Sequence, residues 1–193
     1  MPEQTLQRLL DGNQRFVENR PSLDESESRR KAIAPEQHPF AIVLGCVDSR
    51  VPPELIFDQG LGELFVVRTA GEVLDHAVLG SIEFGVFELN IPLIVVLGHK
   101  NCGAVKAARE SLHQHEKAEA DIGYLVEKLA LAVEIGDEAE SDCLDRAVRA
   151  QVSSVVVQLK QTPILETALA EGRLKIVGAW YDLDTGSVEI IVE

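Results

Sequence analysis

Apolar residues follow two patterns along this chain: continuous runs, and repeats with the spacing of a helix. Continuous apolar runs occupy residues 40–45, 64–68 and 92–97. Runs without polar positions are typical of strands that are covered on both faces in a parallel sheet. Segments with helical spacing lie among them and after them, at about 52–58, 75–90, 102–115, 121–135 and 141–160. This alternation predicts an α/β fold in which helices flank a central parallel β-sheet.

The N-terminal part departs from this alternation. Residues 5–18 place leucine, phenylalanine and valine side chains on one face, which predicts an amphipathic helix. Residues 19–38 are polar, with two prolines and a charged run, and predict an extended or partly helical arm. We expect residues 1–38 to pack against a neighbouring subunit and residues 39–193 to form the α/β domain, so that the chain is effectively a single domain.

The C-terminal part ends the sheet. A short helix at about 163–171 is followed by apolar runs at 174–181 and 187–192. The turn Asp184-Thr185-Gly186 between the two runs is short enough for a hairpin. The last strand is therefore expected to lie antiparallel at an edge.

Composition and charge exclude several classes of protein. The 193 residues are 46% hydrophobic, which suffices for the core of one globular domain. A formal net charge of −14 with interspersed basic residues argues against nucleic acid or anionic lipid as a partner. No apolar stretch is long enough for a membrane span, and the first residues lack the basic and apolar segments of a signal peptide. We therefore expect a cytoplasmic protein.

Residues with metal-binding chemistry follow two of the apolar runs. Cys46, Asp48 and Arg50 come after the first run, and His99 and Cys102 come after the run at 92–97. If these two strands are neighbours, the residues meet at their carboxyl ends, where open α/β sheets bind ligands. Two thiolates with one imidazole suit zinc. The ligands come from distant parts of the chain, unlike those of a zinc finger, and this indicates a catalytic site.

Asp48 and Arg50 decide whether such a site is open. A guanidinium that binds Asp48 in a fork would hold the carboxylate off the metal and leave the fourth position to water. Without that contact, Asp48 could itself complete the ligand set. In the open arrangement Asp48 would orient a zinc-bound hydroxide toward a small carbon electrophile.

The strings GCVDSRVPPELIFDQGLGELFVVRTAG, LGSIEFGV and IPLIVVLGHKNCGAVKAA resemble the β-class carbonic anhydrases, and the similarity covers nearly the whole chain. The resemblance implies one zinc ion per subunit, held by Cys46, His99 and Cys102. It implies that Asp48 is either a fourth ligand or the hydroxide-orienting base, with Arg50 as its partner. The implied activity is the reversible hydration of carbon dioxide to bicarbonate and a proton by zinc-bound hydroxide.

The resemblance to the plant-like branch of this class also implies a substrate pocket and an assembly. Gln37 resembles the amide donor to substrate, and Phe65, Phe84 and Gly103 resemble the small apolar pocket. Family members are dimers or larger with pockets at the subunit boundary, so a homodimer or homotetramer is expected. One departure is Glu72, where many relatives carry asparagine; it leaves this loop without an assigned role.

Two other functions are compatible with these residues. The same fold and metal could hydrolyse carbonyl sulfide or carbon disulfide. A zinc-stabilised binding module without catalysis would need Asp48 to close the site permanently, and such a site has no use for Arg50 or Gln37.

Overall fold

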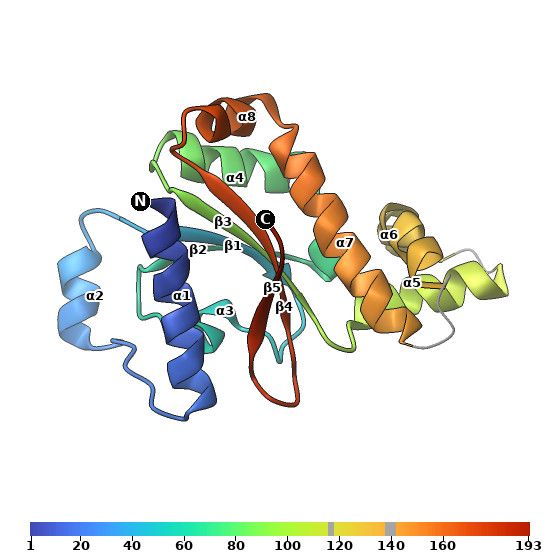
Figure 1. Cartoon of the computed structure of the whole chain (residues 1–193), viewed down its shortest axis with the longest axis horizontal. Coiled ribbons are helices and arrows are strands. Elements are labelled where there is room, and N and C mark those ends of the chain that lie inside the picture. Colours follow the sequence, from blue (N-terminus) through green and yellow to red (C-terminus); the bar gives the residue numbers. More distant parts are fainter. Residues whose placement is uncertain (116–117, 138–141) are drawn as a thin grey trace.

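Five strands form one sheet in the order β2-β1-β3-β4-β5 in the computed structural model, which describes residues 1–115, 118–137 and 142–193 (Figure 1). The strands are β1 (Ala41–Cys46), β2 (Leu64–Thr69), β3 (Leu93–His99), β4 (Lys175–Tyr181) and β5 (Val188–Val192). The first four are parallel and β5 is antiparallel to β4. The predicted parallel sheet with an antiparallel edge strand is confirmed.

Helices cover both faces of this sheet, as the apolar runs predict. The helices of the described residues are α1 (Pro2–Val17), α2 (Glu27–Ile33), α3 (Pro53–Ile56), the 3-10 turn η1 (Ala70–Glu72), α4 (His76–Phe87), α5 (Gly103–Gln114), α6 (Ile122–Asp137), α7 (Cys143–Lys160) and α8 (Pro163–Ala170); α1, α3, α4, α7 and α8 pack on the sheet faces. The predicted start of a helix at about residue 141 lies outside the described residues.

Alternate side chains of the central strands enter two separate cores, because successive residues of a strand point to opposite faces. Ile42 and Leu44 of β1 pack with α4, α7 and α8 on one face. Ala41 and Val43 pack with α1 and α3 on the other. Helices α5 and α6 stand beyond the carboxyl ends of β1 and β3, at the right of Figure 1, and form a third core with part of α7.

The pairing of β1 with β3 determines where the chemistry lies. In this parallel pair Leu44 is opposite Val96 and Gly45 is opposite Leu97. Both strands therefore end at the same edge, and the segments that follow them emerge side by side. This is the neighbour relation that the sequence analysis assumed.

Helix α1 is fixed to its own sheet by a buried asparagine. The Asn13 amide donates to the carbonyls of Ile56 (3.1 Å) and Gly186 (2.8 Å), and its oxygen accepts from the N–H of Val188 (2.9 Å). Helix α2 in the arm has no buried residue, so the predicted partly helical arm is present and exposed. Packing of this region against a neighbouring subunit stays a prediction.

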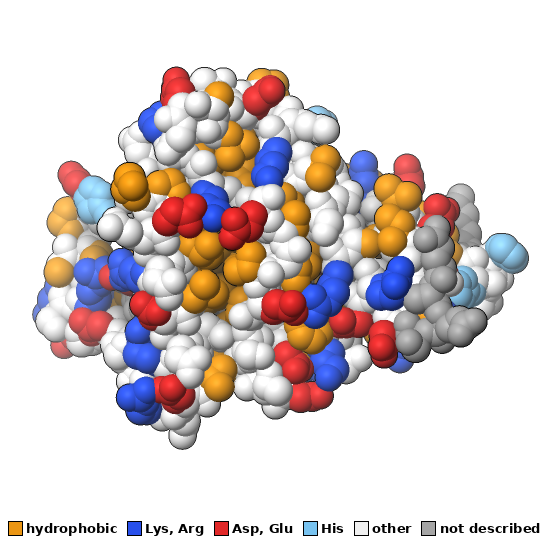
Figure 2. Space-filling model, in the orientation of Figure 1, with side chains coloured by type: hydrophobic (Ala, Val, Ile, Leu, Met, Phe, Trp, Pro, Cys, Tyr) orange, Lys and Arg blue, Asp and Glu red, His pale blue; other side chains and the backbone are white. Residues whose placement is uncertain are grey.

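The surface carries charges of both signs. Figure 2 shows acidic and basic side chains interspersed over the face in view, without a continuous basic patch there. Within the described ranges, no helix combines the length and the apolar character that crossing a bilayer requires.

Candidate metal centre

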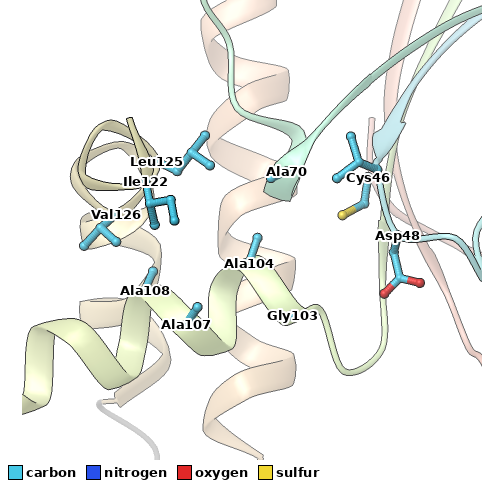
Figure 3. A pocket seen from close by; sticks show the side chains of 11 residues that line it. Cys46, Asp48, Ala70, Gly103, Ala104, Ala107, Ala108, Ile122, Leu125 and Val126 are labelled. Atoms are coloured by element: carbon cyan, nitrogen blue, oxygen red, sulfur yellow. The ribbon is translucent and has the colours of Figure 1, made fainter. Parts of the chain in front are cut away.

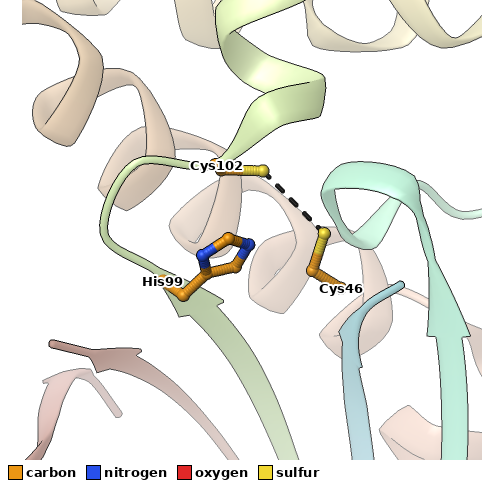
Figure 4. A group of neighbouring side chains, drawn as sticks. All are labelled: Cys46, His99 and Cys102. Atoms are coloured by element: carbon orange, nitrogen blue, oxygen red, sulfur yellow. Dashed lines mark hydrogen bonds between the residues drawn. The ribbon is translucent and has the colours of Figure 1, made fainter. Parts of the chain in front are cut away.

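Three potential ligands meet at the carboxyl ends of the central strands (Figure 4). Cys46 is the last residue of β1, His99 is the last of β3, and Cys102 caps the start of α5. Their ligating atoms all lie within 4.8 Å of one another, and the two sulfur atoms are 3.9 Å apart. All three residues are buried, with His99 and Cys102 at 0% exposure. Strand pairing thus assembles the predicted ligand group.

The histidine is oriented for coordination. Its Nδ1 donates a hydrogen bond to the carbonyl of Lys100 (2.9 Å), which leaves Nε2 as the free acceptor on the side of the cysteines. Nε2 is buried and has no hydrogen-bond partner among the described residues. An unpaired buried acceptor beside two thiols is costly unless a cation binds it. A soft S₂N donor set with a carbonyl behind the imidazole fits a zinc ion.

The two cysteines share a proton when no metal is bound. The pKa of Cys46 falls to about 4, chiefly because the Cys102 thiol donates a hydrogen bond to it. The pKa of Cys102 is raised because its proton is held by Cys46 and because the thiol is buried. A metal ion must displace this proton, so its affinity depends on pH.

Asp48 lies next to the ligands and is held by Arg50. The Arg50 guanidinium donates to both carboxylate oxygens, at 2.9 and 2.7 Å, and the Arg50 backbone N–H adds a third bond at 2.9 Å. These bonds, the guanidinium first, lower the Asp48 pKa to about 2. Asp48 Oδ2 is 3.9 Å from His99 Nε2. The fork that would keep the fourth position open is therefore present.

Arg68 supports the same loop, a role that the sequence analysis missed. Its Nε donates to the Cys46 carbonyl (2.8 Å) and its Nη2 to the Asp48 carbonyl (2.6 Å). Arg68 interrupts an otherwise apolar strand, β2. A charged residue inside such a run was the signal available, since it must find partners at the strand end.

An apolar cavity of about 290 Å³ opens beside Cys46 and Asp48 (Figure 3). Side chains of η1, α5 and α6 form most of its wall, and Asp48 is the charged residue among those that line it. The wall includes Ala70, Gly103, Ala104, Ile122 and Leu125. Gly103, at the start of α5, lines this cavity, and its role in substrate binding stays a prediction.

The other three predicted pocket residues do not line this cavity within one chain. Gln37 is exposed on the arm, and Phe84 on α4 is 47% exposed. Phe65 packs against the core from β2. Strand β2 is at one edge of the sheet and contacts α4, so Phe65 on β2 and Phe84 on α4 both lie near that edge. Their assignment to a pocket stays a prediction that requires a neighbouring subunit.

Glu72 is a buried acid close to the ligands. It is 1% exposed, and neither carboxyl oxygen has a hydrogen-bond partner among the described residues. Burial, and then the negative charge of Cys46, raise its pKa well above the ordinary value of 4.5. Its backbone is left-handed, with φ of +53°.

Comparisons with known proteins agree with this geometry. The family model for carbonic anhydrase matches residues 41–188. A carbonic anhydrase of Mycolicibacterium smegmatis is 45% identical over 185 residues, which are 94% of this chain and 89% of that protein. The structure of a Coccomyxa β-carbonic anhydrase in complex with acetazolamide is 30% identical, with a TM-score of 0.74 over 84% of this chain and 76% of that one. A Sordaria macrospora structure shares the fold at 23% identity, with a TM-score of 0.77 over 84% and 85%.

Proposed function

This chain belongs to the β-class carbonic anhydrases, an enzyme family, and from that premise we propose that it catalyses the reversible hydration of carbon dioxide to bicarbonate and a proton with one zinc ion per subunit. The observation that carries the proposal is the cluster of Cys46, His99 and Cys102 with an ionised Asp48 held beside it. When bound, the zinc ion supplies a hydroxide nucleophile at neutral pH and a positive charge that stabilises product oxygens.

Asp48 orients the attacking water in this proposal. Its carboxylate lies close to the ligand group and can accept a hydrogen bond from a water molecule there. With a pKa of about 2, Asp48 is too weak a base to retain a proton at neutral pH. Its role is therefore to accept the hydrogen bond and align the nucleophile, and Arg50 keeps it ionised and in place.

The cavity is expected to bind carbon dioxide, the substrate, better than bicarbonate, the product. Carbon dioxide is small and has no net charge, so an apolar wall of alanine, leucine and isoleucine side chains can hold it without a desolvation cost. Bicarbonate is an anion, and the same wall offers it no counter-charge. This difference favours binding of substrate and release of product in the hydration direction.

We further propose that the enzyme is a homodimer or homotetramer. Strand β2 is half-buried along its whole length at the sheet edge, and Phe84 and Phe87 are exposed on α4 beside it. A second copy on this face would cover them. It would also bring Gln37, Phe65 and Phe84 near a partner's cavity. The related Sordaria macrospora enzymes are described as tetrameric.

The test combines metal analysis with stopped-flow hydration of carbon dioxide at about pH 8. We expect stoichiometric zinc and activity in the wild type, and loss of both in His99→Ala because one ligand is gone. Asp48→Asn should keep zinc and lose about 10²-fold or more in kcat, because the amide no longer aligns the nucleophile as the carboxylate does.

The control is His113→Ala, which removes a half-exposed histidine on α5 and should retain zinc. Absence of zinc from the wild type, or absence of hydration by the zinc-loaded protein, would refute the proposed function.

A further inference from the structure

The two cysteines of the metal centre are close enough to react with each other. Their sulfur atoms are 3.9 Å apart, and the dashed line in Figure 4 joins them. A disulfide bond is about 2.0 Å long, so each sulfur would have to move by about 1 Å, a shift that side-chain rotation can supply. The pair is therefore a dithiol that an oxidant can close into a disulfide when no metal holds it.

The apolar cavity gives access to Cys46 and not to Cys102. Cys46 is among the residues that line it, and Figure 3 shows the Cys46 sulfur directed toward the lining residues of η1 and α5. Cys102 is 0% exposed and is not among the described residues of the cavity wall. The cavity volume is about 290 Å³, and a cavity of about 150 Å³ is enough for benzene, so a peroxide fits. A small oxidant from solvent thus meets Cys46 first.

The surroundings of the pair favour one end product. Cys46 and Cys102 belong to the third core, together with Val73, Val105 and Leu129. A sulfinic acid in this core would be a buried charge, which is costly unless it is paired. A disulfide has no charge, and it keeps the apolar contacts of the two side chains. The packing therefore favours a disulfide over further oxidation of Cys46.

We propose that Cys46 and Cys102 form a redox modification site in the metal-free protein: hydrogen peroxide oxidises Cys46 through the cavity, and Cys102 then closes a disulfide with it. In the first step the Cys46 sulfur attacks one peroxide oxygen, the O–O bond breaks, and Cys46 becomes a sulfenic acid while one water leaves. In the second step the Cys102 sulfur attacks the Cys46 sulfur, the S–O bond breaks, and a second water leaves. The two thiols lose two electrons and two protons, which reduce one hydrogen peroxide to two waters.

The disulfide would control metal loading. This role rests on the zinc site proposed above, because the disulfide takes away two of its three ligands. Oxidised protein would not bind zinc until a dithiol reductant restores the thiols by thiol–disulfide exchange. Loading of the metal would therefore depend on the redox state of the pair.

The test uses the whole chain, stripped of metal with a chelator and treated with hydrogen peroxide. Thiol titration should show the loss of two of the three thiols, and the intact mass should fall by two hydrogen atoms. Peptide mapping should recover Cys46 and Cys102 as one linked pair. The oxidised protein should bind zinc only after treatment with a dithiol.

Two variants separate the roles of the sulfur atoms. Cys102→Ala should stop at the sulfenic acid of Cys46, which dimedone traps. In Cys46→Ala, Cys102 should react about tenfold or more slowly than Cys46 does, because it does not line the cavity. The control is Cys143→Ser, at the start of α7 and not in the ligand group, which should still form the disulfide. If a ligand variant does not fold, peptide maps of the wild type and of Cys143→Ser decide.

Three intact thiols after treatment, or a sulfinic acid on Cys46 with Cys102 still reduced, would overturn the inference. So would a disulfide that includes Cys143 or that joins two chains. Failure of the reduced wild type to bind zinc would instead refute the proposed metal site. Thiol titration and peptide mapping need no metal, so the two failures are distinguishable.

Discussion

Glu72 is a residue whose burial opposes its own ionisation. Its raised pKa means that the folded protein holds this proton to a higher pH than the unfolded chain does. The stability contributed by the neutral acid is therefore present at low pH and is lost as the pH rises above the ordinary value of 4.5. This sign is opposite to that for Asp48, whose depressed pKa contributes stability that is lost only in strong acid.

In the metal-free protein, Glu72→Gln should reduce the loss of unfolding free energy that accompanies a rise in pH. We expect its free energy of unfolding to exceed that of the wild type at about pH 8, by on the order of 1 kcal/mol, and the gain to shrink toward pH 5. Urea denaturation with a chelator present measures it. Glu134→Gln, an exposed position on α6, is the control. Equal pH slopes in Glu72→Gln and the wild type would contradict the prediction.

At the scale of single residues, the sequence predicted those residues whose type and spacing indicate a chemical role. Cys46, His99 and Cys102 were found because sulfur and imidazole at strand ends suit a metal. Arg68 was not found, although a charged residue inside an apolar run was a signal, because its partners are backbone carbonyls on another part of the chain. Which carbonyls such a side chain meets depends on tertiary contacts, and the local pattern does not show them.

At the scale of elements, helix α7 packs closely against β3 and β4 because the strand positions that face it are glycines. A Cβ added to Gly98, next to His99 in β3, would lie 2.5 Å from a methyl group of Val152 on α7. One added to Gly178 in β4 would lie 2.6 Å from the same side chain. The absence of side chains at these positions lets α7 lie close to the strand that carries the histidine ligand.

Gly98→Ala should therefore destabilise the protein by about 1–3 kcal/mol, the usual cost of overpacking a core. Because the strain arises beside His99, metal affinity should fall as well. The control is Gly80→Ala in α4, where an added Cβ meets nothing within 4 Å; there we expect a gain of about 0.5–1 kcal/mol. Thermal unfolding and metal competition measure both effects, and a neutral Gly98→Ala would show that α7 can move away.

Every predicted strand and helix is present in the described residues, but some boundaries moved. The helix expected over 52–58 is shortened to Pro53–Ile56, and Asp58 beyond it is left-handed with φ of +47°. The helix expected over 75–90 ends at Phe87, before Asn90 with φ of +54°. Periodicity shows that an element exists, whereas its end depends on single backbone conformations that the pattern does not encode.

On the scale of the whole molecule, the substrate pocket was the part least accessible to sequence reasoning. Gly103 lines the cavity, but Gln37, Phe65 and Phe84 do not reach it within one chain. The resemblance named these residues without saying which subunit supplies them. A contact between copies leaves a trace in one chain only as exposed apolar surface, such as Phe84 and Phe87 on α4.

Phe84→Glu should break the assembly that we propose. A charge in an apolar contact opposes association, so sedimentation should show a shift toward monomer. Zinc content should stay unchanged and hydration should fall, because the ligands are intact and the pocket is incomplete. Val157→Glu, at an exposed position on α7, is the control and should leave assembly and rate unchanged. A monomeric wild type, or a fully active monomer of Phe84→Glu, would refute the assembly role.

The placement of the ligands on β1 and β3 has a consequence for biogenesis. The two cysteines are 56 residues apart in the chain and meet only after these strands have paired. When Cys46 leaves the ribosome, the ligand group is still incomplete, because His99 and Cys102 have not yet been synthesised. For the zinc site that we propose, this means that metal loading would follow the pairing of β1 with β3 and so come late in the maturation of the protein.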